Sequence, residues 1–258
     1  MIYVLLITAV SISVYMTGWF IAAQMSGRND IADVAWGLGF NLAAAVSLLA
    51  GNVYPSRGLL ISTLVLIWGL RLALHIHTRN RGRGEDPRYR KWREEWGRWF
   101  VLRSFLQVFM LQGILLLLVA VPVVFVNQAP PAPLGWLDLL GFAVWLYGFG
   151  FEAVGDWQLL KFVRDPTKKG KLMTSGLWRY TRHPNYFGEV TLWWGIWLMA
   201  LALPGGWMTI IGPLTITFLI LKVSGIPMLE KPYEDRADFQ EYKRRTSAFF
   251  PLPPKGGA

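Results

Sequence analysis

Apolar segments long enough to cross a lipid bilayer recur along almost the whole of this sequence. A transmembrane α-helix needs roughly 17 to 25 apolar residues, and seven stretches come close to that length. The composition agrees, since 53% of the 258 residues are hydrophobic and the mean hydropathy is +0.35. The sequence therefore predicts an all-α integral membrane protein, a seven-transmembrane-helix bundle forming one domain over residues 1–258. The predicted spans are residues 2–24, 33–51, 58–77, 101–126, 134–160, 186–203 and 206–222.

Positive charge orients this predicted bundle. Of 26 basic residues, eight lie in residues 78–99, six in residues 162–184 and seven from residue 222 onward. Lys and Arg are retained on the cytoplasmic side of a membrane, and with seven spans these three segments fall on one side. We therefore expect the N-terminus outside, the C-terminus in the cytoplasm, and a multi-pass protein of the inner (cytoplasmic) membrane. The net charge of +10 then reflects topology, and no nucleic-acid partner is expected.

Some kinds of chemistry are excluded or disfavoured by residue counts. The chain has no cysteine, which excludes disulfides, thiolate nucleophiles and cysteine-ligated zinc or iron–sulfur sites. It has three histidines, of which His75 and His77 point to different sides of a helix. No metal site is expected. The first apolar stretch has no basic residue before it, which favours a retained first span over a cleaved signal.

The basic segment at residues 79–99 has two readings. It is a solvated loop at the membrane surface, anchored by Trp92, Trp96 and Trp99, or it binds an anionic ligand, because arginine forks match phosphate oxygens. Three basic connections on one face make a phosphate-bearing cofactor a reasonable hypothesis.

Ionisable residues inside predicted spans are costly and are usually functional. Glu152 and Asp156 are four residues apart, so they lie on one helical face, where they could accept hydrogen bonds from a ligand. The alternative is that Asp156 only sits at the cytoplasmic helix end. Arg71 and His75 share a face in the same way, and Arg71 is either a ligand-binding residue or a structural partner of a buried carboxylate.

The glycines of "GFGFEAVG" (148–155) lie inside a predicted span and not after a strand, so they do not indicate a Rossmann domain. Small residues that allow close helix packing are the simpler interpretation.

The segment "RYTRHPNYFGE" (179–189) resembles the signature of membrane-bound steroid and sterol reductases, in particular the bacterial branch of the steroid 5α-reductase family. The resemblance extends to "DVAWGLGF" (33–40), "WGLRLALHIHTRNRGRGEDPRY" (68–89), the Glu152–Asp156 helix and the tail "SGIPMLEKPYEDRADFQEYKRRTSAFFP" (224–251). It implies a bundle that binds NADPH from the cytoplasm and reduces the C4–C5 double bond of a 3-oxo-Δ4 steroid or a related enone lipid.

The same resemblance implies the site residues. Asn185 and Glu189 would hold the nicotinamide amide, with Asp156 and Glu152 nearby, and Trp36 would border the nicotinamide or the steroid. Phosphates and ribose would meet Arg71, Arg83, Arg164, Lys171 and Arg179. The cofactor-binding set is completed by His75, Tyr180, His183, Tyr186, Lys222 and Glu230.

One part of the family pattern is missing. The family's mammalian members polarise the enone with a Glu in the second span and a Tyr in the third, whereas this chain has no Glu in residues 32–50. Asn41 and the indole N–H of Trp68 are the candidate catalytic hydrogen-bond donors. Because the usual donors are missing, the sequence does not identify the substrate.

Two other functions remain. Similar Arg-His-Pro segments occur in membrane methyltransferases of the isoprenylcysteine or phospholipid type, which use S-adenosylmethionine, and a lipid-binding or scaffolding protein would also carry basic loops. The expected partners are a steroid or enone lipid and membrane lipids. No obligate protein partner is evident.

Overall fold

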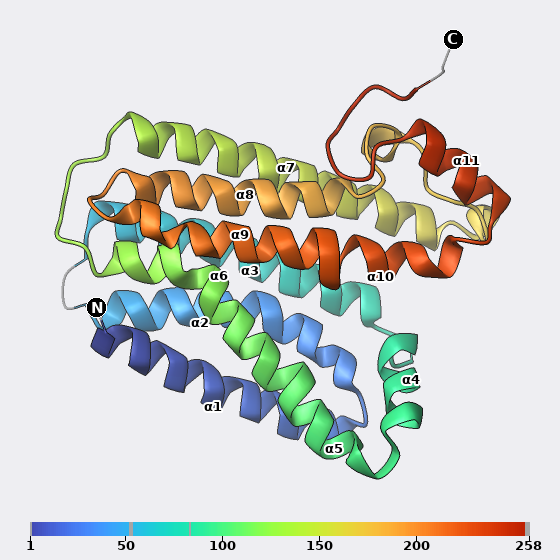
Figure 1. The fold of residues 1–258 in the computed structure, drawn as a ribbon, viewed down its shortest axis with the longest axis horizontal. Coiled ribbons are helices and arrows are strands. Elements are labelled where there is room, and N and C mark those ends of the chain that lie inside the picture. Colours follow the sequence, from blue (N-terminus) through green and yellow to red (C-terminus); the bar gives the residue numbers. More distant parts are fainter. Residues whose placement is uncertain (1, 52–53, 83, 256–258) are drawn as a thin grey trace. The chain divides into compact units, whose positions relative to one another are not determined.

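The computed structural model describes residues 2–51, 54–82 and 84–255, and most of these residues lie in helices (Figure 1). Within those residues, six helical segments are long and apolar enough to cross a membrane. The all-α prediction is therefore confirmed, and the multi-pass membrane character is supported. The six segments are Ile2–Ser26, Asn29–Leu49, Ser56–Asn80, Pro87–Asn127, Trp136–Arg164 and Gly206–Tyr233.

The predicted span at residues 186–203 coincides with a helix, α8 (Pro184–Leu201), that is not among these six segments. Its polar residues Asn185 and Glu189 lower its apolar character. The seventh span and the orientation of the termini therefore stay predictions.

Residue contacts divide the chain into two compact units. Unit 1 comprises residues 1–135 and 199–212, and unit 2 comprises residues 136–198 and 213–258.

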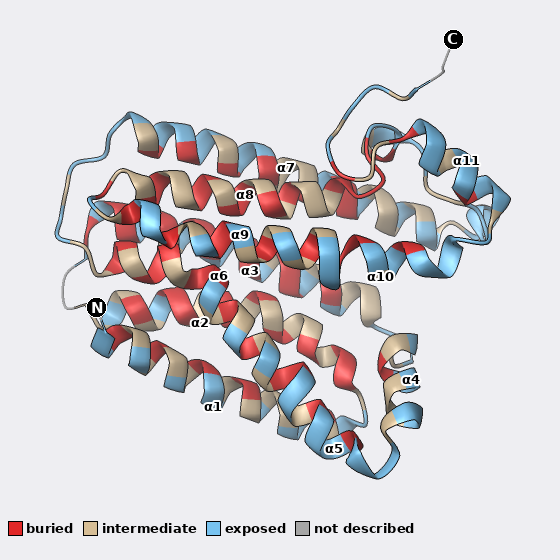
Figure 2. Cartoon of the chain, viewed as in Figure 1, coloured by how far each residue is buried: buried red, intermediate tan, exposed pale blue. Residues whose placement is uncertain are grey.

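Unit 1 is built mainly from four long apolar helices, α1 (Ile2–Ser26), α2 (Ala32–Leu49), α3 (Ser56–Asn80) and α6 (Leu111–Asn127). Helices α2 and α3 approach closely, since a Cβ added to Gly37 would lie 2.8 Å from the carbonyl oxygen of Gly69. Burial follows the inward faces of these helices (Figure 2). The shorter elements of unit 1 are η1 (Asn29–Ile31), α4 (Pro87–Trp96), η2 (Gly97–Trp99), α5 (Phe100–Arg103), the π-helix η3 (Ser104–Met110) and η6 (Gly206–Ile210).

The basic segment at residues 79–99 is not a simple loop, because α4 occupies its second half. Asp86 caps this helix by accepting a hydrogen bond of 2.9 Å from the backbone N–H of Arg88, and Pro87 stands at its first position. Tyr89 then donates a hydrogen bond of 3.0 Å to Asp33 at the start of α2. A local cap and one tertiary contact thus make the second half of this segment a docked helix, and anion binding by the segment stays a prediction.

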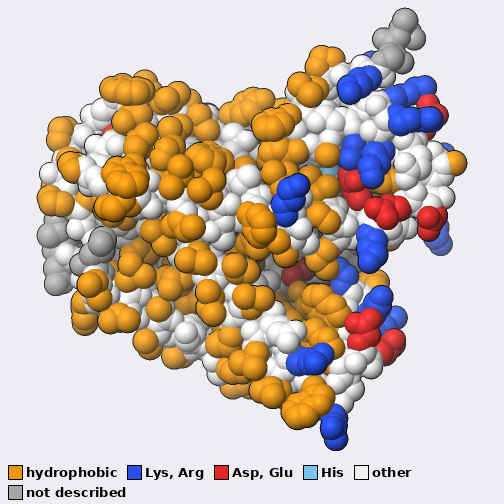
Figure 3. Space-filling view, in the orientation of Figure 1, with side chains coloured by type: hydrophobic (Ala, Val, Ile, Leu, Met, Phe, Trp, Pro, Cys, Tyr) orange, Lys and Arg blue, Asp and Glu red, His pale blue; other side chains and the backbone are white. Residues whose placement is uncertain are grey.

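Unit 2 contains α7 (Trp136–Arg164) and most of α8, which run side by side (Figure 1). Its charged side chains gather around α10 and α11, while apolar side chains cover much of α8 and α9 (Figure 3). The unit is completed by η4 (Pro166–Lys168), η5 (Gly176–Arg179), most of α9 (Ile211–Phe218), the π-helix η7 (Leu219–Val223), α10 (Ile226–Glu230), η8 (Lys231–Tyr233) and α11 (Ala237–Arg245).

Candidate cofactor-binding site

Two carboxylates are buried on one face of α7. Glu152 is 2% exposed and Asp156 is 5% exposed. The i, i+4 spacing that aligns them continues through Leu160 to Arg164, the last residue of the helix. Asp156 is therefore not a solvated residue at the helix end, and this face leads from a buried acidic region to an exposed cation.

Asn185 lies opposite Asp156, in the first turn of α8. Pro184 begins this helix, a position at which the missing N–H of proline costs nothing. Asn185 donates a hydrogen bond of 3.2 Å from Nδ2 to Asp156 Oδ1, while its own Oδ1 is buried and accepts no hydrogen bond from the described residues. A buried acceptor without a donor is costly, so this oxygen is suited to a ligand that brings an N–H or O–H group.

Glycines let α7 and α8 meet backbone to backbone beside these residues. A Cβ on Gly188 would lie 2.4 Å from the backbone nitrogen of Glu152, and one on Gly155 would lie 3.1 Å from Pro184 Cγ. Gly148 makes the same kind of contact, 2.5 Å from the nitrogen of Leu192. The packing interpretation is confirmed for Gly148 and Gly155. It is wrong for Gly150, which faces open space.

A buried cluster of charged side chains precedes α8. Arg182 binds Glu230 through two hydrogen bonds, of 2.8 Å from Nε to Oε1 and 3.2 Å from Nη2 to Oε2. His183 Nε2 lies 2.9 Å from the same Oε1. In the neutral ring whose Nε2–H donates to the carboxylate, Nδ1 is an acceptor, and it is buried without a partner among the described residues.

The η5 turn before this cluster is fixed to α7 from two sides. Trp178 donates a hydrogen bond of 3.1 Å from Nε1 to the carbonyl oxygen of Gly155, and Gln158 Oε1 accepts one of 2.9 Å from the N–H of Leu177. Tyr242 of α11 also donates to the carbonyl of Trp178. Burial raises the pKa of the Tyr242 hydroxyl above its usual value, so it stays protonated and able to donate.

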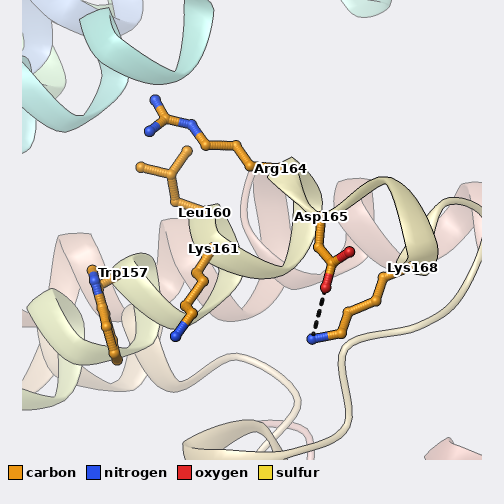
Figure 4. Close-up of a pocket in the computed structure, with 6 residues that line it drawn as sticks. All are labelled: Trp157, Leu160, Lys161, Arg164, Asp165 and Lys168. Atoms are coloured by element: carbon orange, nitrogen blue, oxygen red, sulfur yellow. Dashed lines mark ion pairs between the residues drawn. The ribbon is translucent and has the colours of Figure 1, made fainter.

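A pocket of about 380 Å³ lies at the exposed end of α7 (Figure 4). Leu160 and Arg164 point to one side of the helix end, and Trp157 and Lys161 point to the other. Lys168 forms an ion pair of 3.3 Å with Asp165. The lining carries three basic side chains and this one acidic side chain, which gives it a net charge of +2. The pocket is lined by Trp157, Leu160, Lys161, Arg164, Asp165 and Lys168.

The predicted site residues of unit 2 therefore fall into three groups. Glu152, Asp156 and Asn185 meet at the α7–α8 contact, with Glu189 and Tyr186 half-buried on α8. His183 and Glu230 belong to the buried cluster, where the His183 and Tyr186 rings stack with centroids 5.7 Å apart. The exposed residues are Arg164, Lys171, Arg179, Tyr180 and Lys222.

The remaining predicted residues belong to unit 1. Asn41 is half-buried on α2 against Gly69, and both of its amide atoms are buried without a hydrogen-bond partner among the described residues. Trp68 is fully buried, with its ring 5.3 Å from that of Phe40. Half-buried positions are occupied by Trp36, Arg71 and His75, whereas Arg83 lies outside the described residues.

Three residues that connect these segments were not in the predicted set of site residues. Arg182 stands inside the quoted motif, so its neighbour His183 could have pointed to it, but nothing in the sequence singles out Gln158 or Trp178.

The described residues contain no group of three His, Cys, Asp or Glu side chains that could hold a metal ion.

Six helical segments long and apolar enough to cross a membrane, together with buried polar side chains on α7, are features of a multi-pass membrane protein. The chain belongs to the family described as "Protein of unknown function (DUF1295)", whose family model matches residues 19–246. It is also 38% identical over 68 residues to "3-oxo-5-alpha-steroid 4-dehydrogenase 1" of Mus musculus, and equally to that of Rattus norvegicus. The resemblance to the steroid 5α-reductase family is thereby confirmed.

This similarity covers 26% of the present chain and 26% of each relative, so the match spans about a quarter of the curated relatives' length. No solved structure matches the chain.

Proposed function

We propose that this protein is a membrane-embedded, NADPH-dependent reductase of a 3-oxo-Δ4 steroid or a related enone lipid. The observation that carries the proposal is the unfilled acceptor of Asn185, Oδ1, beside the buried Asp156 and Glu152. A nicotinamide carboxamide offers two N–H donors, and its ribose offers hydroxyl donors. Oδ1 of Asn185 and Nδ1 of His183 are buried acceptors of the kind that such donors satisfy.

The charged end of the cofactor is assigned to the pocket at the end of α7. Asp156 and Arg164 are eight residues apart on one helix face, which corresponds to about 12 Å along the axis. An extended dinucleotide can cover that distance. Arg164, Lys161 and Lys168 provide the positive charge that phosphates require, and the exposed ring of Trp157 offers a surface for a base to stack on.

Bound NADPH would supply the hydride. The chain's own contribution is to orient the nicotinamide through Asn185 and the carboxylates of α7, and to exclude water from the hydride-transfer step. In unit 1, Asn41 is the candidate donor toward the negative charge that develops on the substrate's carbonyl oxygen, because its Nδ2 group is buried and makes no hydrogen bond to the described residues. Trp68 stays a second candidate.

The direct test is binding followed by turnover. Detergent-solubilised protein should be stabilised against heat by NADP⁺ and not by S-adenosylhomocysteine, and it should oxidise NADPH in the presence of a 3-oxo-Δ4 steroid with formation of the saturated ketone. Stabilisation by S-adenosylhomocysteine alone would favour the methyltransferase alternative. Response to neither nucleotide would favour a lipid-binding protein.

The proposal places the protein in the inner membrane with its cofactor site toward the cytoplasm. The basic segments beside the predicted spans support this topology.

A further inference from the structure

The C-terminal tail is bound along the segment that leads into α8. Thr181 and Ser247 form an isolated parallel β-bridge, and the N–H of Arg182 donates a hydrogen bond of 2.9 Å to the carbonyl oxygen of Ser247. The Thr181 hydroxyl donates one of 2.8 Å to the carbonyl of Phe249. Farther along, the N–H of Leu252 donates one of 3.0 Å to Tyr180. The tail is therefore tied to residues 180–182 by backbone as well as side-chain contacts.

Glu230 joins this pair of segments to α10. Its carboxylate accepts hydrogen bonds from Nε and Nη2 of Arg182 and also contacts Nε2 of His183. The Arg182 and Glu230 side chains are 6% and 8% exposed. The other nitrogen of the Arg182 guanidinium, Nη1, donates to the carbonyl of Thr246 in the tail. One carboxylate thus organises three separate parts of unit 2 through charge-assisted hydrogen bonds, which are stronger than neutral ones.

Residues 180–183, which the tail and Glu230 hold, end two residues before Asn185. His183 and Asn185 flank Pro184, so the position of the first turn of α8 depends on where residues 181–183 are held. Asn185 must be directed at Asp156 for its Oδ1 to present a fixed acceptor, and a bound ligand tolerates little displacement of such a group.

We propose that Glu230 is a positioning residue. With Arg182 it clamps residues 180–183 between α10 and the C-terminal tail, and this clamp fixes the turn of α8 that carries Asn185. Glu230 then acts through Asn185 and does not itself touch the cofactor, which differs from the cofactor-binding role that the family resemblance implied for it. This inference rests on the proposed function where it concerns the cofactor. The clamp itself does not depend on that function.

The clamp can be tested without ligand. Hydrogen–deuterium exchange of the full-length protein in detergent should be faster in Glu230→Gln than in the wild type, by roughly tenfold, in two peptides: the start of α8 and the tail at residues 246–252. The matched control is Glu241→Gln, because Glu241 makes exposed ion pairs with Arg244 and Arg245 in the same unit. Faster exchange confined to α10 would overturn the clamp.

The link to the cofactor can be tested with a double-mutant cycle. NADP⁺ affinity should fall roughly tenfold in Glu230→Gln, and the loss should be smaller when Asn185 is already alanine, the remainder being the part that acts through His183. Equal losses in both backgrounds would show that Glu230 acts independently of Asn185 and would refute the positioning role. Absence of NADP⁺ binding by the wild type would instead reject the proposed function and leave the exchange result to decide the clamp.

A milder variant covers the case in which Glu230→Gln does not fold. Thr181→Val keeps the shape of the side chain and removes the hydroxyl's hydrogen bonds to the carbonyls of Phe249 and Ala248, together with the one it accepts from the N–H of His183. It should accelerate exchange in the tail and at the start of α8. Faster exchange in the tail alone would contradict the clamp.

Discussion

Asn185 is bound to Asp156 through Nδ2, at 3.2 Å from Oδ1, and this bond uses the donor side of its amide. The acceptor side, Oδ1, is buried and accepts no hydrogen bond from any residue that the structure describes. The amide is assigned in this orientation because the opposite one would set its oxygen against an oxygen of Asp156. Asp156 thus directs an acceptor into the site.

Replacing Asn185 by alanine should weaken NADP⁺ binding by roughly tenfold, the effect of losing one well-directed hydrogen bond in a buried site. Isothermal titration calorimetry on the purified protein measures this. The matched control is Asn127→Ala in unit 1, where the amide donates to Ser47 Oγ at 2.9 Å and to the carbonyl of Ala44 at 3.2 Å. That variant should lose thermal stability and keep its affinity, whereas equal affinity losses in both would argue against the assignment of Asn185.

Arg164→Gln should also weaken NADP⁺ binding by roughly tenfold, and the size of this loss should depend on the salt concentration. Arg164 is exposed and has no acidic partner among the described residues, so its attraction for phosphate is screened as ionic strength rises. The affinity difference between wild type and variant should therefore shrink at high salt. Arg98→Gln, another exposed arginine, serves as the control and should bind normally. A salt-independent loss in Arg164→Gln would mean that the residue acts through packing.

The helical architecture could be predicted because apolar length and composition decide it locally. The break between the predicted spans at residues 186–203 and 206–222 falls at Gly205, whose φ of 80° is a conformation that favours glycine. The i, i+4 spacing of Glu152 and Asp156 correctly predicted a shared face, because helix geometry alone fixes that relationship.

The contacts between distant segments could not be predicted. The bond from Trp178 to Gly155 and the one from Tyr89 to Asp33 depend on how separate elements dock, and no periodicity encodes docking. Glu230 was selected by resemblance, but its partner Arg182 emerges only when α10 and the segment before α8 are seen together. The individual roles of the site residues stay predictions.

The cap of α4 gives a prediction for pH. Burial tends to raise the pKa of Asp86, but the hydrogen bonds from the Arg88 side chain and backbone outweigh it and hold the pKa below its usual value. A lowered carboxyl pKa stabilises the folded state fully above the unfolded pKa of about 3.9, and this stabilisation is lost as the pH falls through the lower folded-state pKa.

Asp86→Asn keeps a capping side chain and removes the charge. Its deficit in unfolding free energy should be present at pH 6 and should disappear on acidification, which thermal unfolding of both proteins over a pH series would measure. Asp238→Asn is the control, because Asp238 pairs with Arg236 at an exposed position and should have little effect. A deficit in Asp86→Asn that stayed constant down to the acid limit would contradict the charge-based explanation.

The contact between α7 and α8 gives the sharpest prediction for stability. A Cβ on Gly188 would meet two backbone atoms, the nitrogen of Glu152 at 2.4 Å and the carbonyl oxygen of Gly148 at 2.5 Å, and backbone cannot move aside as a flexible side chain can. Gly188→Ala should therefore destabilise the protein by about 1–3 kcal/mol or more.

Gly150→Ala is the matched substitution, since Gly150 lies on the same helix as Gly148 with no atom within 4 Å of the added methyl. It should be neutral or stabilising by up to about 1 kcal/mol, because alanine favours the helix. Gly188→Ala should also weaken NADP⁺ binding, because separating the two helices moves Asn185 away from Asp156. If both variants unfolded at the wild-type temperature, the close backbone contact between α7 and α8 would be wrong, and with it the geometry on which the cofactor site depends.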